Sequence, residues 1–239
     1  MDNLSIQSLL IGVITGFVPT FFWLYFWLKE TEEIHYPLPL VLMVFCLGGI
    51  GVFMAIPLQS ALSSLFAYKS LSYLMTLACV EEVIKLLLVC IAVPRILAPK
   101  LATESAVFLV SCALGFAAVE NTLFLLNPVL HQNINLTLVT GNLRFLGSTI
   151  LHAITAGFVG IGLGLAYNES FFSKLLHMIT GFALAVALHG LFNYFIIKND
   201  TKVTLTTLGV LWALTLVVII IFESLKMVHH QFRRTALSR

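Results

Sequence analysis

The chain has 239 residues, of which 59% are hydrophobic and 10% charged, and its formal net charge at pH 7 is +2. Soluble domains carry about 25% charged residues, so this composition excludes an ordinary soluble enzyme and a disordered segment. The small net charge argues against a nucleic-acid partner, and the composition indicates a polytopic membrane protein surrounded by a lipid bilayer.

Long apolar runs define the expected helices. A helix that spans a bilayer needs about 20 mostly apolar residues, whereas transmembrane strands would appear as segments of about 10 residues with alternating polarity. The sequence follows the helical pattern, and we expect an all-α transmembrane bundle with residues 1–239 forming a single integral membrane domain. In chain order, the seven expected spans are 9–28, 38–58, 71–93, 105–126, 143–166, 175–197 and 203–222.

The regions between and before these spans are short. The N-terminus has no basic region before the first run, the run is too long for the apolar core of a signal peptide, and no cleavage site of small residues follows, which indicates a retained span rather than a signal peptide. The longest connection is expected around residues 127–142, which contain Pro128 and no charged residue. Small residues such as Gly160 and Gly164 in the fifth run predict close helix packing.

The distribution of Lys and Arg near the span ends predicts the orientation. We expect the N-terminus outside and the C-terminus, with a basic tail at 224–239, in the cytoplasm of a bacterial cell. With this orientation the outer set is Lys69, Arg144, Lys198 and Lys202, and the larger inner set is Lys29, Arg95, Lys100, Lys174, Lys226, Arg233, Arg234 and Arg239.

Ionisable residues inside the third span form the strongest local feature. An ionisable residue near the bilayer centre costs at least a few kcal/mol, so each one needs a physical reason. Glu81 and Lys85 are four residues apart on one helical face, in the order that favours an ion pair. Glu82 points about 100° away from Glu81 around the helix axis. A buried ion pair that fixes helix packing is the alternative interpretation of this feature.

The next three spans also carry polar residues, and depth relates them to one another. At about 1.5 Å per residue, Glu81, Glu82, Glu120, His152 and His189 all lie roughly 9–17 Å from the same ends of their spans. His177 lies near the opposite end of the sixth span and is expected to be interfacial. We therefore expect one polar centre within spans 71–197, built from Glu81, Glu82, Lys85, Glu120, His152, His189 and Asn193.

Two kinds of chemistry suit such a centre. In hydrolysis, a carboxylate activates a water molecule and polar groups stabilise the developing oxyanion. Zinc is a second means of activating water, with Glu82, Glu120, His152 and His189 as the ligands; the sequence has no HExxH motif, and the choice between no cofactor and zinc stays open. Alternatively, the same Glu, Lys and His residues would form the relay of a proton- or ion-coupled transporter.

Short motifs in four successive spans resemble the PrsW family of intramembrane proteases. These motifs are Glu81-Glu82-x-x-Lys85, Phe116-x-x-x-Glu120-Asn121, Arg144 followed by His152, and His189-x-x-x-Asn193. The family is distantly similar to the CAAX-protease group, which has EExxxR, FxxxH and HxxxN. Relative to that group, Lys85 replaces Arg one position earlier and Glu120 stands in place of His.

The resemblance implies an intramembrane endopeptidase, glutamic or zinc-dependent, that cleaves a membrane-anchored protein such as an anti-sigma factor on its extracytoplasmic side. Glu81 is then the expected water-activating base, with Glu82 sharing its proton and Lys85 holding both carboxylates. Glu120 and His152 would complete the water or metal site. His189 and Asn193 would stabilise the oxyanion. The excess of carboxylates over imidazoles favours glutamic chemistry.

Overall fold

The computed structural model describes residues 6–29, 37–97, 102–131, 133–198 and 200–237. Among the residues used to predict the orientation, Lys100 and Arg239 lie outside the described residues, as do the side chains of Arg233 and Arg234. The prediction of the basic tail at 224–239 therefore lies partly outside the described residues.

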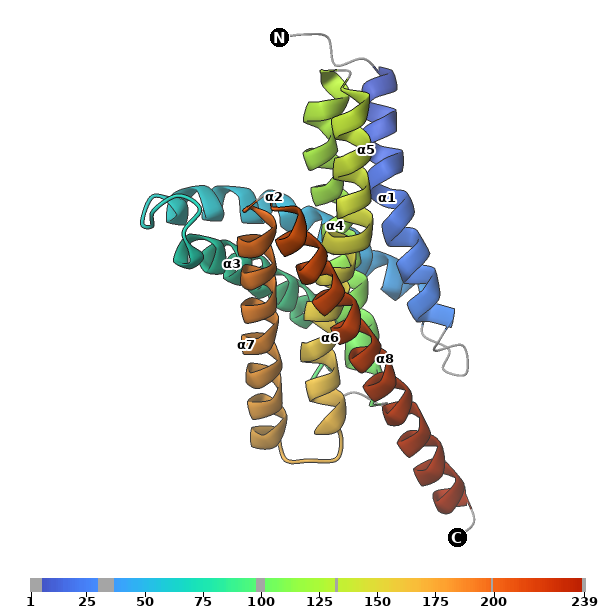
Figure 1. The fold of residues 1–239 in the computed structure, drawn as a ribbon. Helices are drawn as coiled ribbons and strands as arrows, with labels where there is room; N and C mark the ends of the chain where they lie inside the picture. Colours follow the sequence, from blue (N-terminus) through green and yellow to red (C-terminus); the bar gives the residue numbers. More distant parts are fainter. Residues whose placement is uncertain (1–5, 30–36, 98–101, 132, 199, 238–239) are drawn as a thin grey trace.

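All regular structure in the described residues is helical, which confirms the predicted fold class (Figure 1). Local capping explains several helix starts: the side chains of Ser70, Asn133 and Ser170 accept backbone N–H groups at the first turns of α3, α5 and α7. In chain order, the elements are α1 (Ile6–Lys29), α2 (Leu38–Ser63), α3 (Leu71–Ala92), α4 (Glu104–Leu130), α5 (Ile134–Leu143), the π-helix η1 (Arg144–Ser148), α6 (Thr149–Leu165), α7 (Phe171–Ile196) and α8 (Thr201–Leu237).

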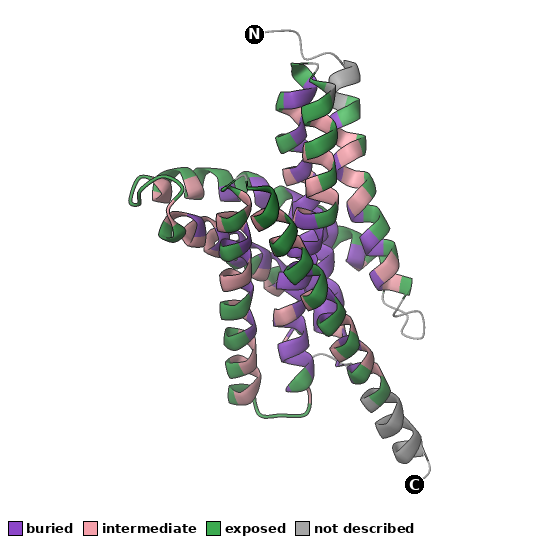
Figure 2. Cartoon of the chain, viewed as in Figure 1, coloured by how far each residue is buried: buried purple, intermediate pink, exposed green. Residues whose placement is uncertain are grey.

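Helices α4 and α6 form the centre of the bundle. Helix α4 packs against α1, α2 and α6, and α6 packs in turn against α7 and α8. Figure 2 shows buried residues concentrated in α4 and α6, while much of α7 and α8 is exposed. Helices α2 and α3 form a hairpin that runs across the direction of α1 and α7 (Figure 1), and α3 packs against α7. This arrangement brings α3, α4, α6 and α7 together.

Six helices in the described part of the chain are long and apolar enough to cross a membrane. The remaining predicted span, 71–93, forms helix α3 but is not among these six, and it carries Glu81, Glu82 and Lys85 near its middle. The protein is therefore a polytopic helical membrane protein. Helix α3 differs from the six candidate spans because it carries three charged residues near its middle. The six candidate spans are Leu10–Lys29, Leu38–Ser63, Glu104–Leu130, Asn135–Leu165, Phe171–Ile196 and Thr201–Met227.

The expected long connection at 127–142 is wrong. Helix α4 continues to Leu130, and α5 begins at Ile134 and runs through η1 into α6. Pro128 lies in the last turn of α4, where its missing N–H removes one backbone hydrogen bond but does not end the helix before Leu130. The side chain of Asn133 caps α5 by accepting the N–H of Leu136 at 3.0 Å. Uncharged residues between two spans thus extend the helices instead of forming a loop.

Glycines set the close approach of the central helices, as predicted for Gly160 and Gly164. A Cβ atom on Gly160 would collide with the backbone of Ala106 in α4, and one on Gly164 would collide with the carbonyl oxygen of Ala102. Only a residue without a side chain permits this contact between α6 and the start of α4. The close packing fixes the distance between the helices that carry Glu120 and His152.

Candidate active site

The carboxylate of Glu82 lies at the centre of a buried polar cluster. Its Oε1 atom accepts hydrogen bonds from Lys85 Nζ at 2.7 Å, His189 Nδ1 at 2.7 Å and Thr155 Oγ1 at 3.2 Å. All four side chains are almost completely buried. One oxygen atom therefore joins α3, α6 and α7.

The partner of Lys85 differs from the predicted one. The sequence indicated an ion pair between Glu81 and Lys85, but Lys85 pairs with Glu82, three residues before it. Glu81 is directed elsewhere, because Gln59 in α2 donates a hydrogen bond to its Oε1 at 2.9 Å. The ammonium group of Lys85 also lies 4.9 Å from the centre of the Phe116 ring, a cation–π contact.

His152 in α6 connects the Glu82 cluster to a second group of charges. Lys85 Nζ lies 2.9 Å from His152 Nδ1, and Glu120 Oε2 lies 3.0 Å from His152 Nε2. Because an ammonium group can only donate and a carboxylate accepts, these partners select the imidazole tautomer with hydrogen on Nε2. Both ring nitrogens of His152 are therefore engaged.

Arg144 at the first position of η1 completes the second group. Its guanidinium forms an ion pair with Glu120 and a hydrogen bond to Asn121. It also donates to Ser148 Oγ at 3.1 Å and lies over the ring of Phe124, with Cζ 4.0 Å from the ring centre. The π-helix begins at Arg144 and ends at Ser148, whose hydroxyl accepts from the same guanidinium that pairs with Glu120, consistent with the frequent occurrence of π-bulges at functional sites.

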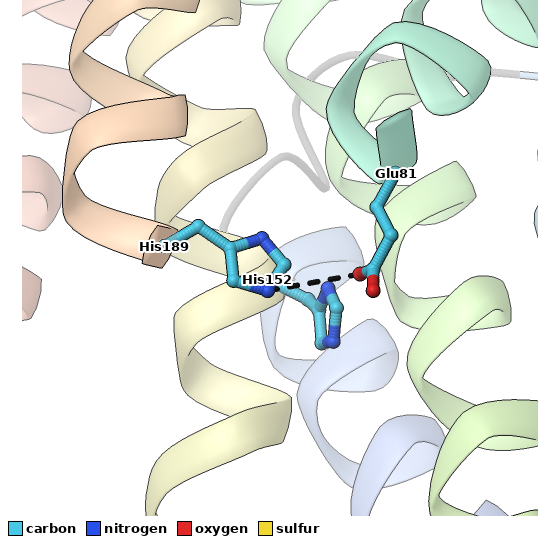
Figure 3. A group of neighbouring side chains, drawn as sticks. All are labelled: Glu81, His152 and His189. Carbon is cyan, nitrogen blue, oxygen red and sulfur yellow. Dashed lines mark ion pairs between the residues drawn. The ribbon is translucent and has the colours of Figure 1, made fainter. Parts of the chain in front are cut away.

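Among the three carboxylates of the cluster, Glu81 is the one with a buried oxygen that lacks a hydrogen-bond partner in the described residues. Its Oε2 is buried and has no hydrogen-bond partner in the described part of the chain. The nearest ion-pair partner of this oxygen is His189 Nε2, at 3.6 Å. Figure 3 shows Glu81 and His189 pointing toward each other from their separate helices, with the ring of His152 beside them. The rings of His152 and His189 meet edge to face, with their centres 5.1 Å apart.

Ligand atoms of Glu81, His152 and His189 all lie within 4.8 Å of one another, so these three residues could hold a metal ion. The set expected from the sequence was Glu82, Glu120, His152 and His189. In the structure, the Glu82 Oε1 atom accepts from Lys85, Thr155 and His189, and Glu120 is bound by Arg144 and His152. The geometry thus favours Glu81 over the other two carboxylates.

A cavity of about 490 Å³ opens onto this cluster, within the range typical of ligand-binding pockets. Glu82 and Lys85 lie behind its wall, whereas the other predicted site residues reach its surface. The polar residues that line the part of the cavity near the cluster are Gln59, Glu81, Glu120, Arg144, Ser148, His152, His189 and Asn193.

Asn193 lies one turn after His189 in α7 and is half-buried in the cavity wall. His177, which the depth argument excluded, forms a hydrogen bond to Ser173 in its own helix and does not line the cavity.

Sequence reasoning did not assign roles to Gln59 and Thr155. Neither side chain is charged, and a Gln near the end of a span resembles an ordinary interfacial residue. Gln59 could have been found from its position, because it is the first amide after the long apolar run of the second span.

The charges of the cluster do not balance. Glu81, Glu82 and Glu120 contribute three carboxylates, while Lys85 and Arg144 contribute two positive charges. With neutral imidazoles, one negative charge is in excess, and Glu81 is the carboxylate with no cationic side chain hydrogen-bonded to it in the described residues. The arrangement suits binding of a cation, a proton or a polarised water at Glu81.

A polytopic helical membrane protein with a buried carboxylate–histidine cluster open to a cavity has the architecture of an intramembrane hydrolase. The model of the PrsW family intramembrane metalloproteases matches residues 36–222, and the chain belongs to this family of intramembrane proteases. The match includes α2 and most of α8, beyond the region 71–197 that carried the resemblance in the sequence.

A curated relative supports the assignment. The chain is 28% identical to Protease PrsW of Oceanobacillus iheyensis over 183 residues, which cover 76% of this chain and 80% of the relative. No solved structure matches the chain significantly.

The Lys85–Glu82 pair generates a prediction about stability. Replacing Lys85 by Met leaves the Glu82 carboxylate buried without its cation, so the free energy of unfolding in detergent should fall by about 3–5 kcal/mol. Lys69→Met is the matched control, because Lys69 is exposed and has no carboxylate partner in the described residues; it should change stability by less than about 0.5 kcal/mol. Equal effects of the two substitutions would contradict a structural role for the buried pair.

Proposed function

We propose that this protease hydrolyses a peptide bond of a membrane-anchored protein, such as an anti-sigma factor, with the attacking water held at Glu81. The observation that carries the proposal is the bare Oε2 atom of Glu81, which is buried without a hydrogen-bond partner among the described residues and lies beside His189 at the cavity wall. A carboxylate oxygen with no other donor is the group in this cluster best suited to accept a proton from water.

Glu82 and Lys85 lie behind the cavity wall, so they influence the attacking water only through the residues that they contact. Because Glu82 accepts the Nδ1–H of His189, the neutral imidazole carries its lone pair on Nε2, toward Glu81. This differs from the role expected from the sequence, in which His189 donates to the oxyanion, because a lone pair cannot donate. Lys85 donates a hydrogen bond to Glu82 and holds it in place, and Thr155 provides a further donor.

Glu120 positions His152, and Asn193 acts on the substrate directly. Glu120 accepts the Nε2–H of His152 and is held by Arg144, so it orients His152 beside Glu81. The carboxamide of Asn193 lines the cavity one turn from His189 and is the group that we assign to stabilise the developing oxyanion. Apolar neighbours in the wall, including Val52, Ile56 and Leu77, favour apolar side chains next to the scissile bond.

The description of the family implies a metal ion, and the residues present fit one. The bare Glu81 Oε2 and the Nε2 lone pair of His189 are donors that zinc accepts, and a histidine whose other nitrogen donates to a carboxylate is the usual arrangement at zinc sites. Glu81, His152 and His189 would hold it. When bound, zinc would supply a Lewis acid that activates water and polarises the peptide carbonyl. His152 could bind the ion only through Nδ1, whose lone pair accepts a hydrogen bond from Lys85 in this structure, so Lys85 would have to turn away for His152 to act as a ligand.

Cleavage of a single-span protein tests the role of Glu81. Wild-type protein and the Glu81→Gln variant are co-expressed with a panel of fluorescent single-span reporters, and the cleavage products are measured. Glu81→Gln keeps the size of the side chain but removes the proton acceptor, so cleavage should fall at least about 100-fold. Glu169→Gln, the same change at an exposed loop position, should cleave normally. Uncleaved reporters with wild-type protein, combined with an ion flux that Glu81→Gln abolishes, would instead support the transporter alternative.

Metal content tests the ligand set independently of activity. Purified wild-type protein should contain about one zinc ion per chain, and His189→Ala should lose it, because each of three ligands is needed for tight binding. His177→Ala is the matched control, since His177 bonds to its own helix away from the cavity. Metal-free wild-type protein with full activity would show that Glu81 activates water without zinc.

We also propose that the N-terminus lies outside the cell and the C-terminus in the cytoplasm, which the distribution of Lys and Arg supports. Lys69 beside Tyr68 and Lys198 beside Tyr194 are pairs of the kind that anchor helix ends at a membrane surface, here at the beginning of α3 and the end of α7. A fluorescent protein fused after Arg239 should be fluorescent, and alkaline phosphatase fused there should be inactive. The reverse pair of results would invert the orientation.

A further inference from the structure

Gln59 in the last turns of α2 contacts Glu81 directly. Its Nε2 group donates to Glu81 Oε1 at 2.9 Å and to the backbone carbonyl oxygen of Leu77 at 3.3 Å. Gln59 is half-buried and lines the cavity together with Glu81. It belongs to none of the motifs that indicated the polar centre.

The chemistry of the two acceptors determines how the amide is oriented. A carboxylate and a carbonyl oxygen both need donors, so the NH₂ end of Gln59 must face them, and its two N–H groups match the two acceptors. Leu77 lies four residues before Glu81, in the preceding turn of α3. A single amide thus ties the carboxylate of Glu81 to the backbone of its own helix.

The contact also decides which oxygen of Glu81 stays bare. With Oε1 held by Gln59, the atom without a partner in the described residues is Oε2, 3.6 Å from His189 Nε2. We propose that Gln59 is a positioning residue for the protease reaction: it holds Glu81 in the rotamer that presents Oε2 to the water and to the histidines. This inference rests on the proposed role of Glu81.

Helix packing alone does not explain the contact. The hairpin of α2 and α3 is held by apolar contacts elsewhere along α2, where Gly51 allows Leu88 and Ile84 of α3 to approach closely. The other residues of α2 that line the cavity, Val52, Ala55 and Ile56, are apolar. Gln59 therefore adds a directed hydrogen bond to a hairpin that is already packed.

Two variants of Gln59 separate positioning from packing. Gln59→Met keeps the length of the side chain without donors, and Gln59→Glu keeps its shape but places a second carboxylate against Glu81. For a reporter that the wild-type enzyme cleaves, Gln59→Met should lower kcat about 10- to 100-fold, as is usual for residues that orient a reacting group. The KM should stay within about twofold, and Gln59→Glu should lower kcat at least as much.

The matched control is Ser63→Ala, one turn further along α2, because the Ser63 hydroxyl donates to the carbonyl oxygen of Ser60 in its own helix and has no other side-chain hydrogen bond within the described ranges. This variant should keep the wild-type kcat, and thermal unfolding in detergent should show both Gln59 variants folded. A kcat within twofold of wild type for Gln59→Met, or a loss that follows the folded fraction in both Gln59 variants, would overturn the inference. If Glu81→Gln is inactive and Gln59→Met is fully active, the inference alone fails; if Glu81→Gln is fully active, the proposed function fails and the inference fails with it.

Discussion

The Oε1 atom of Glu82 accepts hydrogen bonds from Lys85, Thr155 and His189, and the arrangement of three helices depends on this one oxygen. A charge in hydrocarbon costs several kcal/mol unless it is paired and hydrogen-bonded. Helices α3, α6 and α7 must therefore meet where Glu82 lies, and no helix can be displaced without leaving a charge or a donor unpaired. His152 extends the same requirement to Glu120 in α4.

Adjacent carboxylates on α3 have opposite environments. Glu82 lies behind the cavity wall, and its Oε1 accepts three hydrogen bonds. Glu81 lines the cavity, and its Oε2 has no hydrogen-bond partner in the described residues. Glu82 joins three helices and orients His189, while Glu81 is the carboxylate to which we assign the reaction with substrate. A pair of neighbouring residues can divide structure and reactivity in this way because successive side chains on a helix point about 100° apart.

Much of the site follows from sequence patterns. The structure brings Glu81, Glu120, His152 and His189 together, as predicted, and His177 lies away from them. The depth count treated the spans as parallel, whereas α3 runs across the direction of α7, so packing of α3 against α7 and not depth alone brings Glu81 to the cluster. Spacing along one helix could not identify the partner of Lys85. An i, i+4 pair and an i, i+3 pair are both within reach on a helix, and the choice depends on Gln59, which comes from α2 and draws Glu81 away.

The sequence by itself determined that this chain is an all-α membrane protein with its ionisable residues gathered in four successive apolar segments, because hydrocarbon tolerates few charges and helices satisfy their own backbone. Only the tertiary structure decided how those residues divide: which carboxylate is saturated, which is bare, and which nitrogen of each histidine is engaged. These properties depend on contacts between α2, α3, α4, α6 and α7, whose rotation about their own axes is set by packing across the whole bundle. Local spacing carries no information about that rotation.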